Sequence, residues 1–448
     1  MQPVYEALGR FLWGPPMLAV FLFTGAYLTL RSRAFPVRRL GLWLKQTFGS
    51  LFKKRAGADA HSITQWQAMT SALAACLGTG NIVGVATALT LGGPGAIFWM
   101  WISAALGMMT CCAENILGVK YRKRLPSGGW MGGPMGYLRD GLGSKFLAGV
   151  YAALLSLASF GIGNMTQANA IAEAAKQSLR LPAWATGLIV AALIGLVIFG
   201  GVKRIAKVTE FVVPVMTGLF MIACAAVLIA NRGALPGTVS LILREAFAVK
   251  AVTGGALGYG IKKALRYGVA RGVFSNEAGL GSSAVVHAAA DVKEPAEMGM
   301  WGVAEVFIDT ILMCTVTALV FLSSGAWQAG YTDVALAGAA FACVLGRWGV
   351  PFMSLCIMLF AFATLTGWSY YGEQGARWLL GEKSARAYRC VYLGTIVLGC
   401  VMRLDTVWAV ADILNGLMAI PNLIGVLVLS GQATRELRGY ERRLKYLK

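Results

Sequence analysis

The sequence is poor in charged residues. Only 13% of its 448 residues are charged and 57% are hydrophobic, whereas about 25% charged is usual in a soluble domain. So few charges cannot form the surface of a water-soluble globule. The composition therefore excludes a soluble enzyme, a disordered chain and a disulfide-stabilised secreted domain. It predicts an all-α polytopic membrane protein whose surroundings are a lipid bilayer.

The residues that build most metal and hydrolytic sites are also scarce or scattered. The chain has two histidines and nine cysteines, and it contains no CxxC pair, HExxH motif, Walker A motif or GxSxG motif. Most cysteines lie inside apolar runs, where they usually serve as small packing residues. Hydrolysis, ATP use and a histidine-built metal site therefore lack a motif. We expect neither an enzyme nor an organic cofactor.

Acidic residues are half as frequent as basic ones, with 20 Asp and Glu against 40 Lys and Arg and a net charge of +20. The basic residues occur in short runs between apolar stretches rather than on one face, so we expect no nucleic-acid partner, and no obligatory protein partner is evident. Basic runs mark cytoplasmic ends of membrane spans. They predict an external N-terminus and a cytoplasmic C-terminus in the inner membrane, with cytoplasmic runs at 31–55, 120–124, 203–207 and 435–448.

Apolar stretches long enough to cross a bilayer recur along the chain, since one crossing needs about 20 such residues. The first lacks a small-residue cleavage site and is expected to be retained. An odd number of spans agrees with termini on opposite sides. We count eleven, at 11–30, 66–91, 95–119, 146–175, 183–202, 208–230, 267–290, 298–323, 349–372, 388–403 and 406–430.

One basic run disagrees with this topology. Lys262, Lys263, Arg266 and Arg271 precede the seventh span, on the side counted as external. Either an amphipathic or re-entrant helix occupies 234–263, or the count is wrong by one there.

Two spans contain polar, glycine-rich interruptions. In the second span Thr79 and Asn81 stand among Gly78, Gly80 and Gly84. Small residues also serve close helix packing, but an asparagine at the bilayer centre needs a partner. We favour an unwound segment whose carbonyls and half-helix ends bind an ion and a charged solute.

The second interruption lies in the seventh span, where Ser275, Asn276 and Glu277 are followed by Gly279 and Gly281. A carboxylate within the membrane is a functional candidate by default. Glu277 either takes part in coupling or holds the break together structurally.

The two interruptions lie five spans apart, as in transporters built from inverted repeats. We expect an N-terminal extra helix before a core of five plus five helices. The predicted divisions are an N-terminal helix and basic loop (1–62), a first repeat (63–232), an external connecting segment (233–265), a second repeat (266–432) and a basic tail (433–448).

Several motifs in these spans resemble those of the alanine or glycine:cation symporter family, the sodium:alanine symporters. The resemblance implies a leucine-transporter-like fold and symport of sodium with a small neutral amino acid, without separating alanine from glycine or serine. The motifs are GTGNIVGVATA (78–88), GGPGAIFWMW (92–101), GGPM (132–135), GNMTQAN (163–169), RGVFSNEAGLG (271–281) and GWSYYGE (367–373).

The resemblance also implies roles for single residues. The backbone of Thr79 and Gly80 would hold the substrate carboxylate, and Trp368 would close the pocket over the substrate side chain. The other implied substrate residues are Asn81, Gln167, Phe274, Ser275, Asn276 and Thr366. The implied sodium ligands are Ala74, Cys76, Leu77, Asn81, Ser275, Ala363, Thr364 and Thr366. Because the stretch before Gly78 has few hydroxyls, main-chain carbonyls would serve there.

Alternatives remain at this point. A proton-coupled symporter of the same fold would use Glu277 as carrier, and an ion channel would share the polar breaks. Glu114 is expected to pair with Lys120 at the inner end of the third span. Glu305 and Asp309, four residues apart, are expected to pair structurally or to line an ion path.

Overall fold

Helices dominate the computed structural model, which describes residues 8–9, 11–51, 61–126, 128–248, 259–402 and 404–446. Lys53, Lys54 and Arg55 of the predicted basic loop lie outside the described residues, as do 249–258 of the connecting segment and Lys448 of the tail.

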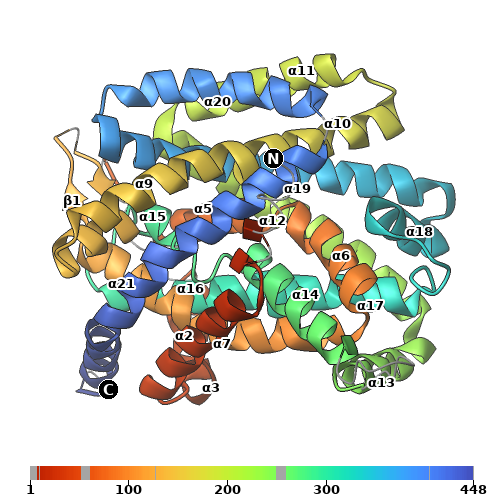
Figure 1. The fold of residues 1–448 in the computed structure, drawn as a ribbon, viewed down its shortest axis with the longest axis horizontal. Helices are drawn as coiled ribbons and strands as arrows, with labels where there is room; N and C mark the ends of the chain where they lie inside the picture. Colours follow the sequence, from red (N-terminus) through yellow and green to blue (C-terminus); the bar gives the residue numbers. More distant parts are fainter. Residues whose placement is uncertain are drawn as a thin grey trace.

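Within the described residues, several α-helices precede residue 63 and the helices of the predicted first repeat follow (Figure 1). The first break and a π-helical turn interrupt two of them. The helices are α2 (Pro15–Arg31), α3 (Phe35–Arg38), α4 (Leu40–Gln46), α5 (Gln65–Cys76), η2 (Thr79–Asn81), α6 (Val83–Gly92), α7 (Gly95–Lys120), α8 (Pro134–Gly136), η3 (Tyr137–Gly141), α9 (Lys145–Phe160), η4 (Gly161–Met165), α10 (Thr166–Leu179), α11 (Ala183–Ile198) and α12 (Gly201–Ala230).

The second part repeats this pattern after a connecting helix. Its elements are α13 (Leu235–Ala246), α14 (Tyr259–Asn276), α15 (Ser283–His287), α16 (Pro295–Val306), η6 (Phe307–Cys314, π-helical), α17 (Thr315–Ser323), α18 (Asp333–Leu345), α19 (Gly349–Leu380), α20 (Ser384–Val401) and α21 (Leu404–Tyr446). Strands β1 (Lys123–Arg124) and β2 (Trp130–Met131) form an antiparallel hairpin with Lys123 opposite Met131.

Helices cover each of the eleven predicted spans. Within the described residues, six helical stretches are both long and apolar enough to cross a membrane, and α6 and α11 are shorter apolar helices. The all-α membrane fold is therefore confirmed, while the number of eleven crossings stays a prediction.

Helices of the two halves pack in matching pairs. The third span, α7, packs along α16 of the eighth; α9 and α10 of the fourth pack along α19 of the ninth; and α11 of the fifth packs along α20 of the tenth. Figure 1 shows α11 and α20 side by side along one edge of the molecule. Each pair joins helices five spans apart in the predicted order, which hold equivalent positions in two five-helix repeats.

The connecting region contains a helix, as the first of the two topological alternatives supposes. Helix α13 packs against α7 and α17, and in Figure 1 it lies near α17, far from the C-terminus. Lys262, Lys263, Arg266 and Arg271 fall within α14. Two predicted boundaries also lie inside helices, since α14 begins before residue 265 and α21 continues past residue 432.

Small residues allow the helices around the second break to approach closely. A Cβ on Gly268 of α14 would lie 2.2 Å from the carbonyl oxygen of Ala96 in α7. Close approach through glycine is how helices associate in lipid, where burial of apolar surface gives no driving force between them.

We expect Gly268→Ala to force α14 away from α7 and to cost about 1–3 kcal/mol, the usual range for overpacking. Thermal unfolding of the purified protein in detergent would show a melting temperature lowered by several degrees. The matched control is Gly218→Ala in α12, where a Cβ meets no atom within 4 Å. Equal melting temperatures for the two variants would contradict the close packing.

Candidate functional site

The first break separates α5 from α6 at residues 77–82. Gly78 is extended, with φ −117° and ψ −153°, and a single 3₁₀ turn, η2, follows it. A Cβ on Gly78 would lie 2.5 Å from the Thr364 hydroxyl oxygen and 3.5 Å from Oε1 of Gln167. The glycine therefore lets α19 and α10 approach the opened backbone directly.

The second break separates α14 from α15 at residues 277–282. Glu277, Gly279 and Gly281 all have positive φ, at 55°, 97° and 74°. Glycine adopts this region freely, but a glutamate there is strained by roughly 1–3 kcal/mol. The surrounding side chains must hold Glu277 in this conformation.

Glu277 is held by two donors on its carboxylate. The Trp368 indole donates to Oε1 at 3.0 Å, and the Ser282 hydroxyl donates to Oε2. Both groups are buried. The carboxylate thus closes the break through side chains; whether it also takes part in coupling stays a prediction. The hydrogen bond to Glu277 places Trp368 beside the second break. Trp368 also lies close to Gly163, because a Cβ added to Gly163 would lie only 2.3 Å from the Trp368 Cβ.

At Gly80 and Asn81 the first break contacts the last residues of α14, directly before the second break. An added Cβ on Gly80 would lie 3.6 Å from the Phe274 ring and 3.7 Å from the Cα of Ser275. Asn81 donates through Nδ2 to the Ser275 hydroxyl at 3.1 Å and to Oδ1 of Asp309 at 2.7 Å. Predicted residues from both halves are therefore neighbours.

Asp309 joins this cluster, although the sequence placed it only with Glu305, as a structural pair or part of an ion path, and not among the sodium ligands. It is fully buried, accepts from Asn81 and from the Ser275 hydroxyl (3.1 Å), and lies in the π-helical segment η6. Oδ1 of Asn81 is buried without a hydrogen-bond partner among the described residues. The cluster therefore combines a carboxylate, a hydroxyl and a free amide oxygen, the ligand types that hard cations prefer.

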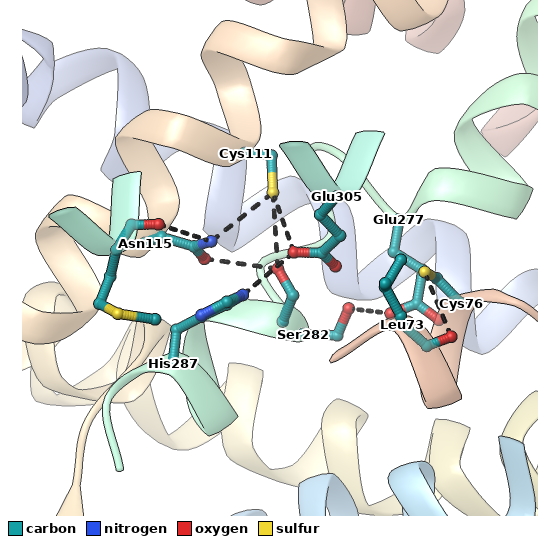
Figure 2. Close-up of polar contacts among 10 residues, drawn as sticks. Leu73, Cys76, Cys111, Asn115, Glu277, Ser282, His287 and Glu305 are labelled. Carbon is teal, nitrogen blue, oxygen red and sulfur yellow. Dashed lines mark hydrogen bonds and ion pairs between the residues drawn. The ribbon is translucent and has the colours of Figure 1, made fainter. Parts of the chain in front are cut away.

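The predicted pairing of Glu305 with Asp309 is wrong. Glu305 instead contacts His287 Nε2 at 3.1 Å and Cys111 Sγ at 3.7 Å through its Oε2. Figure 2 shows this second group, in which Asn115 lies beside Cys111 and His287. The four-residue spacing did not predict these contacts, because the carboxylates of Glu305 and Asp309 face different neighbouring helices.

A further group of oxygens lies where the first break begins, at the end of α5. The Thr364 hydroxyl donates to the Ala74 carbonyl at 3.1 Å, which joins the ninth span to the end of α5. Leu77 and Ala363, which lie close to Ala74 and Thr364 in sequence, are buried. The Cys76 thiol donates to the Leu73 carbonyl within α5. The Thr366 hydroxyl likewise donates to Phe362 in its own helix, at 2.9 Å.

The remaining predicted substrate residues divide between the two breaks. The Thr79 hydroxyl donates to Oε1 of Gln167 at 3.3 Å. Asn276 instead has its amide engaged at the second break, donating to Thr310 at 3.0 Å and accepting from the Ala278 N–H at 3.0 Å.

Glu114 also supports the second break, which corrects its predicted pairing with Lys120. Its Oε1 accepts from the Gly279 N–H at 3.0 Å and from Nδ2 of Asn422 at 2.5 Å. Asn422 donates in addition to the Gly279 carbonyl at 2.8 Å. Lys120 pairs with Glu436 at 2.7 Å instead. A glutamate that accepts from a glycine-rich break 165 residues away leaves no local signal in the sequence.

A cavity reaches the first break from one end of the molecule. Its volume is about 580 Å³, and its walls run from buried Thr79 to Glu173 and Lys176, which are exposed on α10. Residues of α6, α18 and α19 complete the lining. A smaller cavity of about 260 Å³ lies near the β1–β2 hairpin and includes Glu373, which pairs with Arg377 and Arg389.

Two polar helix breaks that meet inside a bundle of paired helices are a feature of secondary transporters. The model of one family, described as the sodium:alanine symporter family, matches residues 1–448. The chain belongs to this family. The family predicted from the sequence motifs is therefore confirmed.

Relatives extend over nearly the whole chain. It is 40% identical over 443 residues to the sodium/alanine symporter AgcS of Methanococcus maripaludis, covering 97% of this chain and 96% of the relative. It is 38% identical over 452 residues to the probable sodium/glutamine symporter GlnT of Bacillus subtilis, covering 99% and 92%. An uncharacterised transporter of Haemophilus influenzae is 42% identical over 452 residues, covering 99% and 97%.

Among solved structures, a sodium-coupled sialic acid symporter resembles this chain with a TM-score of 0.53 and 11% sequence identity, covering 97% of this chain and 86% of that one. This similarity concerns the fold, and the leucine-transporter-like architecture is confirmed. The chain is thus a multi-pass membrane protein of a transporter family.

The role of Glu114 in holding the second break is testable. Glu114→Leu removes the acceptor of a buried N–H, which costs about 1–3 kcal/mol, and it lowers the melting temperature. Glu114→Gln retains an amide oxygen that accepts from Gly279, so we expect it to melt close to the wild-type protein. Thermal unfolding in detergent measures both; a glutamine variant as unstable as the leucine variant would contradict the hydrogen-bonding role.

Proposed function

We propose that this protein imports a small neutral amino acid, alanine or glycine, together with sodium by alternating access. The observation that carries the proposal is the contact of Gly80 and Asn81 in the first break with Ser275 at the end of α14, directly before the second break and next to the buried carboxylate of Asp309. Membership of the sodium:alanine symporter family supports the choice of ion and substrate class.

The substrate would bind between the breaks. Main-chain N–H groups of Thr79 and Gly80 in the turn η2, which precedes α6, suit a carboxylate, because the first N–H groups of a helical turn carry partial positive charge. Main-chain carbonyls of 274–277 suit the ammonium group. Gln167 bonds Thr79 and would orient this end of the site, with Ser275, Asn276 and Thr366 on its border.

Aromatic rings would set the size of the substrate. Phe274 faces Gly80, and Trp368 is anchored to Glu277. A site bounded by both rings favours a methyl group or hydrogen as substrate side chain. One methylene changes binding by only about 1–3 kcal/mol, so alanine, glycine and serine compete closely.

Sodium would occupy two places. The first combines Asn81, Ser275 and Asp309, where Asp309 adds a full negative charge to the ligands expected from the sequence. The second combines the Thr364 hydroxyl with main-chain oxygens of Ala74, Cys76, Leu77 and Ala363, and Thr366 lies one turn away. Oxygen ligands at a helix break suit a hard cation without any particular side chain.

Coupling would follow because ion and substrate share the same broken helices. Binding of one closes the segments that the other needs, so each raises the affinity for the other. The cavity of about 580 Å³ leads to Thr79, while the smaller one near the hairpin is lined by no predicted site residue. The basic runs predict that the hairpin and the C-terminus lie in the cytoplasm. With that topology, this arrangement would correspond to a protein open to the outside.

Uptake into proteoliposomes tests the proposal. With an inward sodium gradient we expect alanine to accumulate above its external concentration, and with potassium replacing sodium we expect only equilibration. A pH jump in sodium-free vesicles separates the proton-coupled alternative: accumulation there would overturn sodium coupling. Saturation of the initial rate with alanine excludes a channel.

Asp309→Asn tests the first sodium place. Losing the carboxylate should raise the sodium concentration for half-maximal uptake on the order of ten-fold or more, and Asn81→Ala should act in the same direction. Asp140→Asn is the control, because that carboxylate pairs with Lys123 and Arg139 far from the breaks. Sodium-induced thermal stabilisation gives a second readout. Wild-type half-saturation in Asp309→Asn would remove this residue from the ligand set.

A further inference from the structure

Five arginines surround one small cavity where α2 ends and α21 passes it. The cavity measures about 210 Å³ and lies far from both helix breaks in sequence and in contacts. Two segments from opposite ends of the chain form this cavity. The first is the turn after α2 together with helix α3, and the second is the last part of α21. Its lining is Arg33, Arg38, Arg39, Arg438, Glu441 and Arg442.

This lining carries a large excess of positive charge. Five guanidinium groups face one carboxylate, so the net charge is five minus one, or +4. Glu441 lies 3.2 Å from Arg38 and 3.8 Å from Arg39, and its single charge cannot balance the set. Guanidinium groups stay charged at any physiological pH. An arrangement of this kind is stabilised by an anion between the arginines.

Some of these arginines are fixed by the fold and others are free to bind. Arg38 donates to the Arg33 carbonyl at 3.1 Å, and Arg438 donates to the Arg31 carbonyl. Arg33 and Arg442 are exposed and make no side-chain hydrogen bond or ion pair within the part of the chain that the structure describes. Two guanidinium groups are therefore available at the rim of a cavity whose walls are held in place.

Exposed apolar side chains neighbour the arginines of the cavity in sequence. Leu30 at the end of α2 is 79% exposed, Val37 in α3 is 81% exposed and Leu40 at the start of α4 is 49% exposed. In a multi-pass membrane protein, apolar side chains just past the end of a spanning helix lie where acyl chains begin, and cationic side chains lie at the headgroups. The same short segment thus offers both kinds of contact.

We propose that this cavity binds the phosphate of an anionic phospholipid, whose acyl chains lie along Leu30, Val37 and Leu40. Arginine suits this ligand because its planar group can donate two parallel hydrogen bonds to phosphate oxygens. The bound lipid holds the segment after α2 against the end of α21. This site is independent of the proposed transport activity.

The neighbouring apolar side chains favour a lipid over a soluble phosphate compound. A free phosphate would use the arginines alone, and it would compete with water and salt at an exposed rim. A phospholipid adds burial of its acyl chains, and each CH₂ group removed from water strengthens the binding.

The test uses the purified full chain in a non-ionic detergent, titrated with phosphatidylglycerol, phosphatidylcholine or inorganic phosphate while thermal unfolding is followed. We expect phosphatidylglycerol to raise the melting temperature at much lower concentration than the other two. Each arginine near an anionic lipid strengthens binding roughly five-fold. The double variant Arg33→Gln/Arg442→Gln should therefore need about 25-fold more phosphatidylglycerol for the same effect.

Arg435→Gln is the matched control, because Arg435 lies on the same exposed part of α21 but does not line the cavity. It should titrate like the wild-type protein. Equal melting temperatures of all variants in phosphatidylcholine would show that the substitutions leave the fold intact. An unchanged phosphatidylglycerol response in the double variant, an equal loss in Arg435→Gln, or equal stabilisation by inorganic phosphate would each overturn the proposal.

Discussion

Backbone polar groups opened inside a bilayer must find partners within the protein, because the hydrocarbon offers no water to bind them. Much of this structure serves that constraint. At the second break the Gly279 N–H donates to Glu114, the Gly279 carbonyl accepts from Asn422, and the Leu280 carbonyl accepts from Tyr151 at 2.8 Å. These partners come from α7, α21 and α9. A single six-residue break therefore sets how three other helices pack around it.

The pairing of helices across the two halves explains why neither half alone contains a complete site. Asn81 belongs to the first half, and its partners Ser275 and Asp309 belong to the second. Ala74 and Thr364 are divided in the same way. A change in the relative position of the halves alters both oxygen clusters at once, which is the physical requirement for two ligands to favour the same closure.

The sequence reading succeeded where the signal was local. Glycines beside Thr79 and Asn81, or beside Ser275 and Glu277, favour a broken helix over an undisturbed apolar one, so both breaks could be located without a structure. The reading failed for charged residues whose partners lie far along the chain. Glu114 was expected to pair with Lys120 six residues away, and Glu305 with Asp309 four residues away, yet all four bind groups on other elements.

Composition and local pattern are sufficient to predict that the chain lies in a lipid bilayer, and where its apolar stretches and two breaks fall, because these depend on the transfer of short segments into lipid. They are also sufficient to predict the family, because its motifs are contiguous in the sequence. They do not decide which buried side chains meet. Asp309 joins Asn81 from 228 positions away and Asn422 joins Glu114 from 308 positions away. Such contacts depend on how the two halves pack, and packing is set by many weak contacts summed over the whole bundle.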